Sequence, residues 1–241
     1  MRSQTAISCM VLYLLAAAVP PANYAAGQPT DVTAEAKVQM VGAKSTERHS
    51  NEGVVLWLTP IDAPAPLRST TSSGGRLQLA QKNKEFVPHL LVVQVGSTVA
   101  FPNLDPFFHN VFSQFNGKRF DLGLYESGSN RSVRFDRAGI SYIFCNIHPE
   151  MSAVVVSVPT PYFAISTAAG NLTIHDVLPG TYMMHVWAMG NSDSDITANG
   201  RRISVSGASV DLGSIALQES VPGPHKNKFG EDYEIKKPSS Y

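Results

Sequence analysis

Short runs in which apolar and polar residues alternate make up most of the chain after residue 30, a pattern typical of half-buried β-strands. Val32 to Val41 alternates in this way, whereas Gly53 to Leu58 (GVVLWL) is a continuous apolar run of strand length. The polar stretch between them predicts a connecting loop. We therefore expect residues 32–62 to form an N-terminal hairpin.

A denser series of short apolar runs fills residues 75–159, where Gly, Pro, Asn and Asp separate one run from the next. The series has no good helical period, and its spacing is typical of a β-sandwich or Greek-key barrel. The strands predicted here are Arg76–Gln81, Leu90–Val95, Thr98–Phe101, His109–Ser113, Arg131–Phe135, Ser141–Cys145 and Ala153–Val158.

A boundary follows at Pro159-Thr160-Pro161, and alternation resumes from Tyr162 to Trp187. This run, with its Pro-Gly-x-Tyr pattern at 179–182, resembles the carboxypeptidase-regulatory or transthyretin-like β-sandwich module. The usual opening strands of such a module are missing just before Tyr162. The resemblance therefore implies that residues 32–62 supply them and that the 75–159 domain is inserted into a second sandwich, which continues over 160–218.

The predicted fold class is all-β, a Greek-key sandwich followed by a second small sandwich of the immunoglobulin or transthyretin type. The polar, proline-containing end of the chain, 219–241, predicts a flexible tail. Charged residues make up 16% of the chain and the formal net charge is zero, which excludes nucleic-acid binding as a main role.

The first 26 residues have the pattern of a signal peptide. Arg2 gives a positive start, Ala6 to Val19 is apolar, and small residues follow near Ala25. The alternative is an uncleaved anchor, but the apolar run is shorter than the roughly 20 residues that a spanning helix needs. We expect a periplasmic or secreted protein with no integral membrane segment after cleavage.

One loop carries three side chains that can bind a metal. Cys145, His148 and Met151 recur at intervals of three residues after a strand-like run, and Pro149 disfavours a helical conformation at His148. Removal of the signal would also remove Cys9, so Cys145 would be a lone thiol in an oxidising compartment. A buried structural cysteine is the alternative, but that interpretation does not account for the neighbouring His and Met.

The softness of these donors favours copper. Thiolate and imidazole suit copper, zinc or iron, whereas a thioether is a poor ligand for zinc. Two His, one Cys and a weak axial Met describe a mononuclear blue-copper site, which needs one more histidine. His109, at the start of an apolar run, supplies it. The predicted ligands are His109, Cys145 and His148 in a plane, with Met151 axial.

The two segments together resemble the cupredoxin family. The resemblance rests on Gly96 to Asn103, on His109-Asn110-Val111 and on Cys145-x2-His148-x2-Met151. The short ligand loop is similar to that of amicyanin, and the wider segment resembles plastocyanin-like proteins of methylamine utilisation. In cupredoxins the Asn after the first ligand ties the two ligand loops together, which implies that role for Asn110; a turn-forming Asn is the alternative.

The resemblance implies an exported carrier of single electrons, which works with a redox partner protein and is not itself an enzyme. Related copper enzymes place a His beside the ligand Cys, where this chain has Phe144 and Asn146. Two alternatives remain open: a copper carrier or sensor without redox turnover, and a β-module that binds a partner or glycan with copper as an ancillary group.

Overall fold

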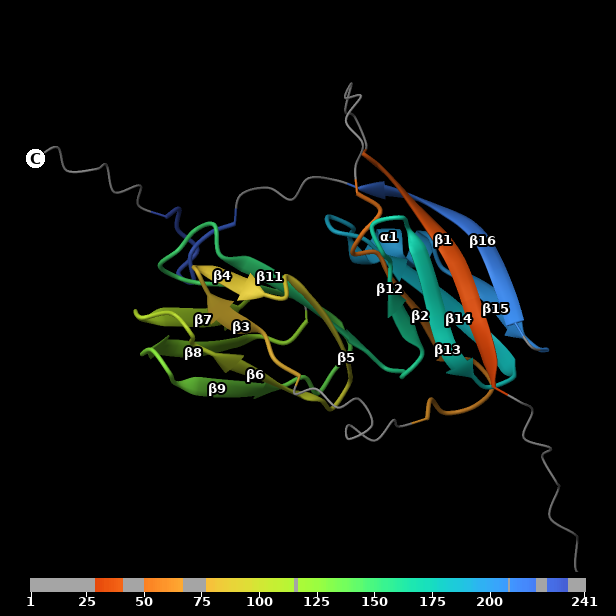
Figure 1. The fold of residues 1–241 in the computed structure, drawn as a ribbon, viewed down its shortest axis with the longest axis horizontal. Helices are drawn as coiled ribbons and strands as arrows, with labels where there is room; N and C mark the ends of the chain where they lie inside the picture. Colours follow the sequence, from red (N-terminus) through yellow and green to blue (C-terminus); the bar gives the residue numbers. More distant parts are fainter. Residues whose placement is uncertain are drawn as a thin grey trace, which may run out of the picture.

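The computed structural model describes residues 29–40, 50–66, 77–114, 117–207, 209–219 and 225–233. The predicted signal peptide and most of the stretch that joins the predicted hairpin to the 75–159 domain lie outside these residues. Within the described part the chain is nearly all β, which confirms the predicted fold class. Figure 1 shows the strands in two bodies that lie side by side.

The first sandwich contains β3 to β11. One layer is a five-stranded sheet in the order β5-β11-β10-β7-β8, and the other is built from the pairs β3-β4 and β6-β9, which two isolated bridges join through β3 and β6. A buried aliphatic and aromatic cluster fills the space between the layers. The strands are β3 (Ala80–Lys82), β4 (Glu85–Val87), β5 (Leu90–Gln94), β6 (Thr98–Pro102), β7 (His109–Ser113), β8 (Phe120–Tyr125), β9 (Asn130–Arg134), β10 (Gly139–Phe144) and β11 (Ser152–Val158).

The second sandwich combines strands from both ends of the chain. Its sheets have the orders β13-β1-β16 and β12-β2-β14-β15, so the first sandwich lies in sequence between β2 and β12. A separate apolar cluster lies between these sheets. The strands are β1 (Thr30–Met40), β2 (Val55–Pro60), β12 (Phe163–Ile165), β13 (Asn171–Val177), β14 (Gly180–Trp187), β15 (Arg201–Val205) and β16 (Ser209–Glu219).

The predicted N-terminal hairpin over 32–62 is wrong as a pairing. β1 pairs with β13 and β16, whereas β2 pairs with β12 and β14 in the opposite layer. Each strand buries its alternate residues in the same core, Val32 from one side and Leu56 from the other. The polar connection between the strands is long enough to cross from one layer to the other, so adjacency in sequence did not require pairing.

A third apolar cluster joins the two sandwiches. Successive side chains of a strand point to opposite faces, so Val155 on β11 enters the first core while Val154 and Val156 face the second sandwich. On β2, Leu56 enters the second core and Trp57 faces the first sandwich. Because both faces of these strands are covered, they have continuous apolar sequences rather than alternating ones.

Three elements were not predicted from the sequence. The short strand β4 pairs with β3 in the layer opposite the five-stranded sheet. β8 pairs with β7 at the edge of the five-stranded sheet, although it contains Asp121 and Gly123, residue types that are more common in turns. The short helix α1 (Asp193–Ala198) begins at Ser192, whose hydroxyl accepts a hydrogen bond from the Asp195 amide in a capping box. Among the described residues, no helix has the length and apolar character needed to cross a membrane.

Candidate metal centre

The predicted ligands come from two neighbouring strands. His109 is the first residue of β7, and Cys145 directly follows β10, which pairs with β7 through Phe144 and Phe112. This pairing brings together two positions that are 36 residues apart in sequence. His148 and Met151 lie in the turn between β10 and β11.

The turn is closed by its own backbone. The Cys145 amide donates to the Met151 carbonyl at 3.2 Å, and the Met151 amide donates to the His148 carbonyl at 3.1 Å. These hydrogen bonds bring the two ends of the turn together, and Pro149 limits the conformation of the residue before it. The segment therefore wraps back on itself as the sequence indicated.

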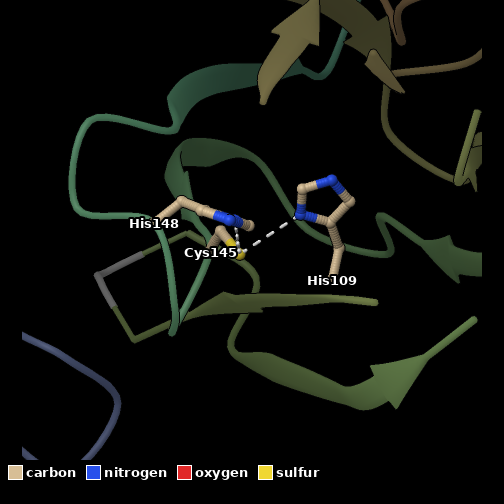
Figure 2. Close-up of side chains that lie close together, drawn as sticks. All are labelled: His109, Cys145 and His148. Carbon is tan, nitrogen blue, oxygen red and sulfur yellow. Dashed lines mark hydrogen bonds between the residues drawn. The ribbon is translucent and has the colours of Figure 1, made fainter. Parts of the chain in front are cut away.

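Three donor atoms converge at the end of the sandwich. Sγ of Cys145 lies 3.7 Å from Nδ1 of His109 and 3.5 Å from Nδ1 of His148. The three atoms all lie within 4.8 Å of one another, and Figure 2 shows the side chains pointing toward one another. His109 and Cys145 are fully buried, whereas His148 is partly exposed. This set of soft and borderline donors could hold a metal ion, and copper is among the metals it suits.

Met151 is buried in the apolar cluster that also contains Cys145. Its backbone closes the ligand turn, as described above. Its predicted role as a weak fourth ligand stays a prediction, and a Met at this position also fills core volume.

A buried carboxylate, which the sequence did not single out, fixes the His109 ring. Oδ2 of Asp105 lies 2.9 Å from Nε2 of His109, and the Asp105 side chain is almost fully buried. With the proton on Nε2, the ring donates to Asp105 and presents the lone pair of Nδ1 toward Cys145. Asp105, four positions before His109, therefore leaves Nδ1 of His109 free to bind a metal.

Backbone amides hold Asp105 in its ionised form. Burial alone would raise the pKa of the Asp105 carboxyl, but hydrogen bonds from the Lys84 amide, from His109 and from the Asn83 amide outweigh burial, and the net pKa is lowered. The amide of Asn83 donates to Oδ1 at 2.6 Å and that of Lys84 to Oδ2 at 2.9 Å. The loop between β3 and β4 thus supports the loop between β6 and β7, which contains Asp105 and leads to His109.

His148 has an environment that favours its neutral form. Burial lowers the pKa of His148, and the nearby His109 and Lys84 lower it further. A neutral imidazole has a free lone pair, which metal binding requires. His148 is partly exposed, and its sequence neighbour Ile147 is 48% exposed. Phe108, next to His109, is 52% exposed, so apolar side chains flank both histidines.

The side chain of Asn110 contacts the edge strand β8. Its side-chain amide donates to Oδ1 of Asp121 on β8 at 2.7 Å. Its own Oδ1 is buried and has no hydrogen-bond partner among the described residues. A direct tie from Asn110 to the Cys145 loop stays a prediction.

Residues 225–233, which belong to the predicted flexible tail, lie against the candidate site. The Tyr233 hydroxyl donates to the Cys145 carbonyl at 2.8 Å, and the Lys228 amide donates to Oδ1 of Asn146 at 2.9 Å. The His225 ring stacks on Phe144, with ring centroids 4.0 Å apart. The polar composition of this segment gave no signal of these contacts.

Comparisons with solved structures find cupredoxins over part of the chain. A purple cupredoxin from Nitrosopumilus maritimus has 26% identity and a TM-score of 0.30, covering 33% of this chain and 95% of its own. A reduced amicyanin variant has 23% identity and a TM-score of 0.32, covering 42% of this chain and 98% of its own. No protein-family model matches the chain, and no curated protein matches it.

A copper-containing nitrite reductase from Thermus scotoductus SA-01 is also similar. It has 21% identity and a TM-score of 0.33, and the match covers 41% of this chain. This chain spans only 25% of the reductase's length.

Proposed function

We propose that this protein is an exported mononuclear copper protein that carries single electrons between partner proteins and is not itself an enzyme. The observation that carries the proposal is the convergence of Nδ1 of His109, Sγ of Cys145 and Nδ1 of His148 within 4.8 Å. A copper ion held by this donor set supplies one-electron oxidation and reduction. Export is proposed from the N-terminal sequence pattern.

The protein's own residues limit how far the donor side chains move when the bound copper changes oxidation state. Two of the three donors project from or directly follow strands of a packed sandwich, and Asp105 fixes one imidazole by a hydrogen bond. Side chains held by packing and by outer hydrogen bonds keep their geometry. A site that changes little between oxidation states suits electron transfer better than copper delivery, which requires release of the metal.

The partly exposed His148 gives the proposed route for the electron. His109 and Cys145 are buried, so His148 is the ligand through which a partner would approach most closely. Exposed apolar side chains at Ile147 and Phe108 favour contact with a protein surface and exclude water from it. A redox partner protein is therefore expected to dock at this end of the first sandwich.

The visible absorption spectrum of the copper-loaded protein tests the proposal. We expect an intense thiolate-to-copper absorption band at about 600 nm. Metal analysis should give one copper ion per chain. Cys145→Ser should abolish the band, and His148→Gln should weaken or shift it. His175→Gln is the matched control, because His175 lies on an exposed strand position of the second sandwich and contacts Asp31. A copper-loaded protein without the band would contradict the proposal.

Electron self-exchange then separates electron transfer from copper carriage. Fast exchange with unchanged copper content supports a carrier of electrons. Slow exchange, together with easy transfer of copper to an acceptor chelator, would support a copper carrier with the same ligands instead.

A further inference from the structure

The C-terminal segment 225–233 lies beside a different sandwich from the strand that precedes it. β16 is in the second sandwich, yet the described contacts of residues 225, 228 and 233 are with the first. In Figure 1 the segment, coloured dark blue, lies beside the body that contains β7 and β8.

The first contact satisfies a backbone group that the sheet leaves free. Pairing between β10 and β11 ends at Phe144 and Ser152, so the Cys145 carbonyl lies beyond the ladder. A buried carbonyl without a partner is unfavourable, and the Tyr233 hydroxyl provides the hydrogen bond at 2.8 Å. The phenol thus fixes the peptide group of the residue that carries the thiolate.

The second contact links the two ligand-bearing segments through Lys228. Its amide donates to Asn146, the residue after Cys145, and its ammonium group lies 2.9 Å from Oδ2 of Asp121. The other carboxylate oxygen of Asp121 accepts from Asn110, the residue after His109. A continuous chain of polar contacts therefore runs from beside His109 to beside Cys145 by way of Lys228.

The third contact is a ring stack that covers the strand before Cys145. His225 and Phe144 are nearly parallel, with an interplanar angle of 13°, and Tyr233 meets the edge of His225 with centroids 5.3 Å apart. The two ends of the segment therefore meet over the end of β10. Phe144 is buried although β10 ends there.

The segment has a shape of its own that presents these groups. Oδ1 of Asn227 accepts hydrogen bonds from the amides of Phe229 and Glu231 at 2.9 and 3.0 Å. The Gly230 amide donates to the Asn227 carbonyl at 3.0 Å, and Gly230 takes a positive φ of 83°. A turn stabilised in this way needs less ordering when it contacts the site.

We propose that segment 225–233 is a positioning element of the metal centre, in which Tyr233 holds the Cys145 peptide group and Lys228 holds the Asn146 side chain, so that the ligand turn keeps the geometry that binds the metal. This inference rests on the proposed copper site. It also gives the second sandwich a role, since that sandwich carries the segment and is joined to the first by an apolar junction. None of the three residues touches the metal-binding atoms, so they act through the ligand loop.

Tyr233→Phe tests the proposal by removing one hydroxyl and keeping the ring. The Cys145 carbonyl then loses its donor, and we expect copper release to a chelator to become about tenfold faster, the lower end of the effect of losing such outer hydrogen bonds. The hydroxyl hydrogen points at the Cys145 carbonyl and so places a partial positive charge beside the residue that carries the thiolate. Its loss should disfavour the more negative reduced state, so the reduction potential should fall.

Tyr182→Phe is the matched control. The Tyr182 hydroxyl also donates to a backbone carbonyl, that of Leu178 at 2.6 Å, but it lies in the second sandwich away from the ligand loop. This variant should leave the copper band, potential and release rate as in the unmodified protein. A further measurement needs no metal: in the metal-free protein, amide exchange at Cys145 and Met151 should be faster in Tyr233→Phe than in Tyr182→Phe.

The outcomes separate the two proposals. If the unmodified protein shows no thiolate-to-copper band, the proposed function fails, while faster amide exchange in Tyr233→Phe would still support the positioning role. If the band is present but Tyr233→Phe matches Tyr182→Phe in release, potential and exchange, the positioning role is wrong. Should Tyr233→Phe fold poorly, His225→Ala, which removes the stack on Phe144, should give the same direction of change, and no change there would overturn the inference.

Discussion

Asp105 and Cys145 face opposite ring nitrogens of one imidazole: Oδ2 of Asp105 is 2.9 Å from Nε2 of His109, and Sγ of Cys145 is 3.7 Å from Nδ1. A neutral imidazole carries one proton, and the carboxylate determines which nitrogen holds it. The metal-binding lone pair is thereby directed toward the thiol. Preparation of the site begins in the loop between β6 and β7, outside the ligand turn.

Asp105→Asn should weaken copper binding by about 10-fold to 100-fold, because the imidazole loses the group that fixes its tautomer. The amide cannot accept all three hydrogen bonds that Asp105 accepts, so the free energy of unfolding of the metal-free protein should also fall by about 1–3 kcal/mol. Copper affinity by competition with a chelator and chemical denaturation measure the two effects.

Asp136→Asn serves as the control for this change, because Asp136 is an exposed carboxylate paired with Lys118 away from the ligands. It should alter neither copper affinity nor stability appreciably. Equal affinity in Asp105→Asn and in this control would show that the carboxylate does not orient His109.

Met151→Leu separates packing from ligation. The two side chains have similar volumes, so the metal-free protein should lose less than about 1.5 kcal/mol of stability. If the thioether is a weak ligand, the absorption spectrum and the reduction potential of the copper protein should nevertheless change. Met151→Ala should lower the free energy of unfolding by roughly 2–5 kcal/mol relative to the unmodified protein, through the cavity it leaves. An unchanged spectrum in the leucine variant would assign Met151 to the core alone.

Val156→Ala tests the junction between the sandwiches. Val156 is buried in the cluster that contains both tryptophans of the chain, Trp57 and Trp187. Losing two methyl groups there should lower the free energy of unfolding by roughly 2 kcal/mol, and tryptophan fluorescence should report the loss directly. Val87→Ala, the same change at a position 47% exposed, should stay within about 0.5 kcal/mol of the unmodified protein. Equal losses in both variants would argue against a packed junction.

Alkaline pH should destabilise the second sandwich through Tyr182. Burial, with a smaller contribution from Tyr162, raises the pKa of Tyr182 to about 12, so folding favours the neutral phenol. This contribution to stability is complete below the unfolded pKa near 10 and is lost as the pH rises through about 12. Its size is at most roughly 2–3 kcal/mol. Denaturation at several pH values should therefore show a shallower decline between pH 10 and 12 in Tyr182→Phe than in the unmodified protein.

The sequence indicated the strands that are buried on both faces and the donor residues at their ends. Continuous apolar runs such as the one in β11 leave little choice of structure, and a thiol, an imidazole and a thioether at intervals of three residues restrict the chemistry, with the second imidazole 36 residues upstream of the thiol. The structure brings His109, Cys145 and His148 together. This convergence could be predicted because the types of donor residue and their spacing can be read from the sequence.

Other features could not be read from local pattern. Asp105 stands in a polar, proline-containing turn, where an Asp is ordinarily a turn residue. β8 contains Asp121 and Gly123, yet it forms an edge strand because β7 offers it a ladder of free backbone groups. β1 and β2 are adjacent in sequence but lie in opposite layers. The contact of Tyr233 with Cys145 joins positions 88 residues apart in a polar segment, and only the tertiary fold determines it.

The insertion of one sandwich within the other has a consequence for the order of assembly during synthesis. Every strand of the inserted unit precedes residue 160, so this unit can fold while β1 still waits for its partners β13 and β16. Such distant pairing is slow to form. Tyr233 follows β16 in the sequence, so a chain interrupted between them would contain every described strand and all the donor residues, yet the Cys145 carbonyl would lack its hydrogen bond from the Tyr233 hydroxyl. If segment 225–233 positions the ligand turn as proposed, the Cys145 peptide reaches its final geometry only after that segment has been synthesised.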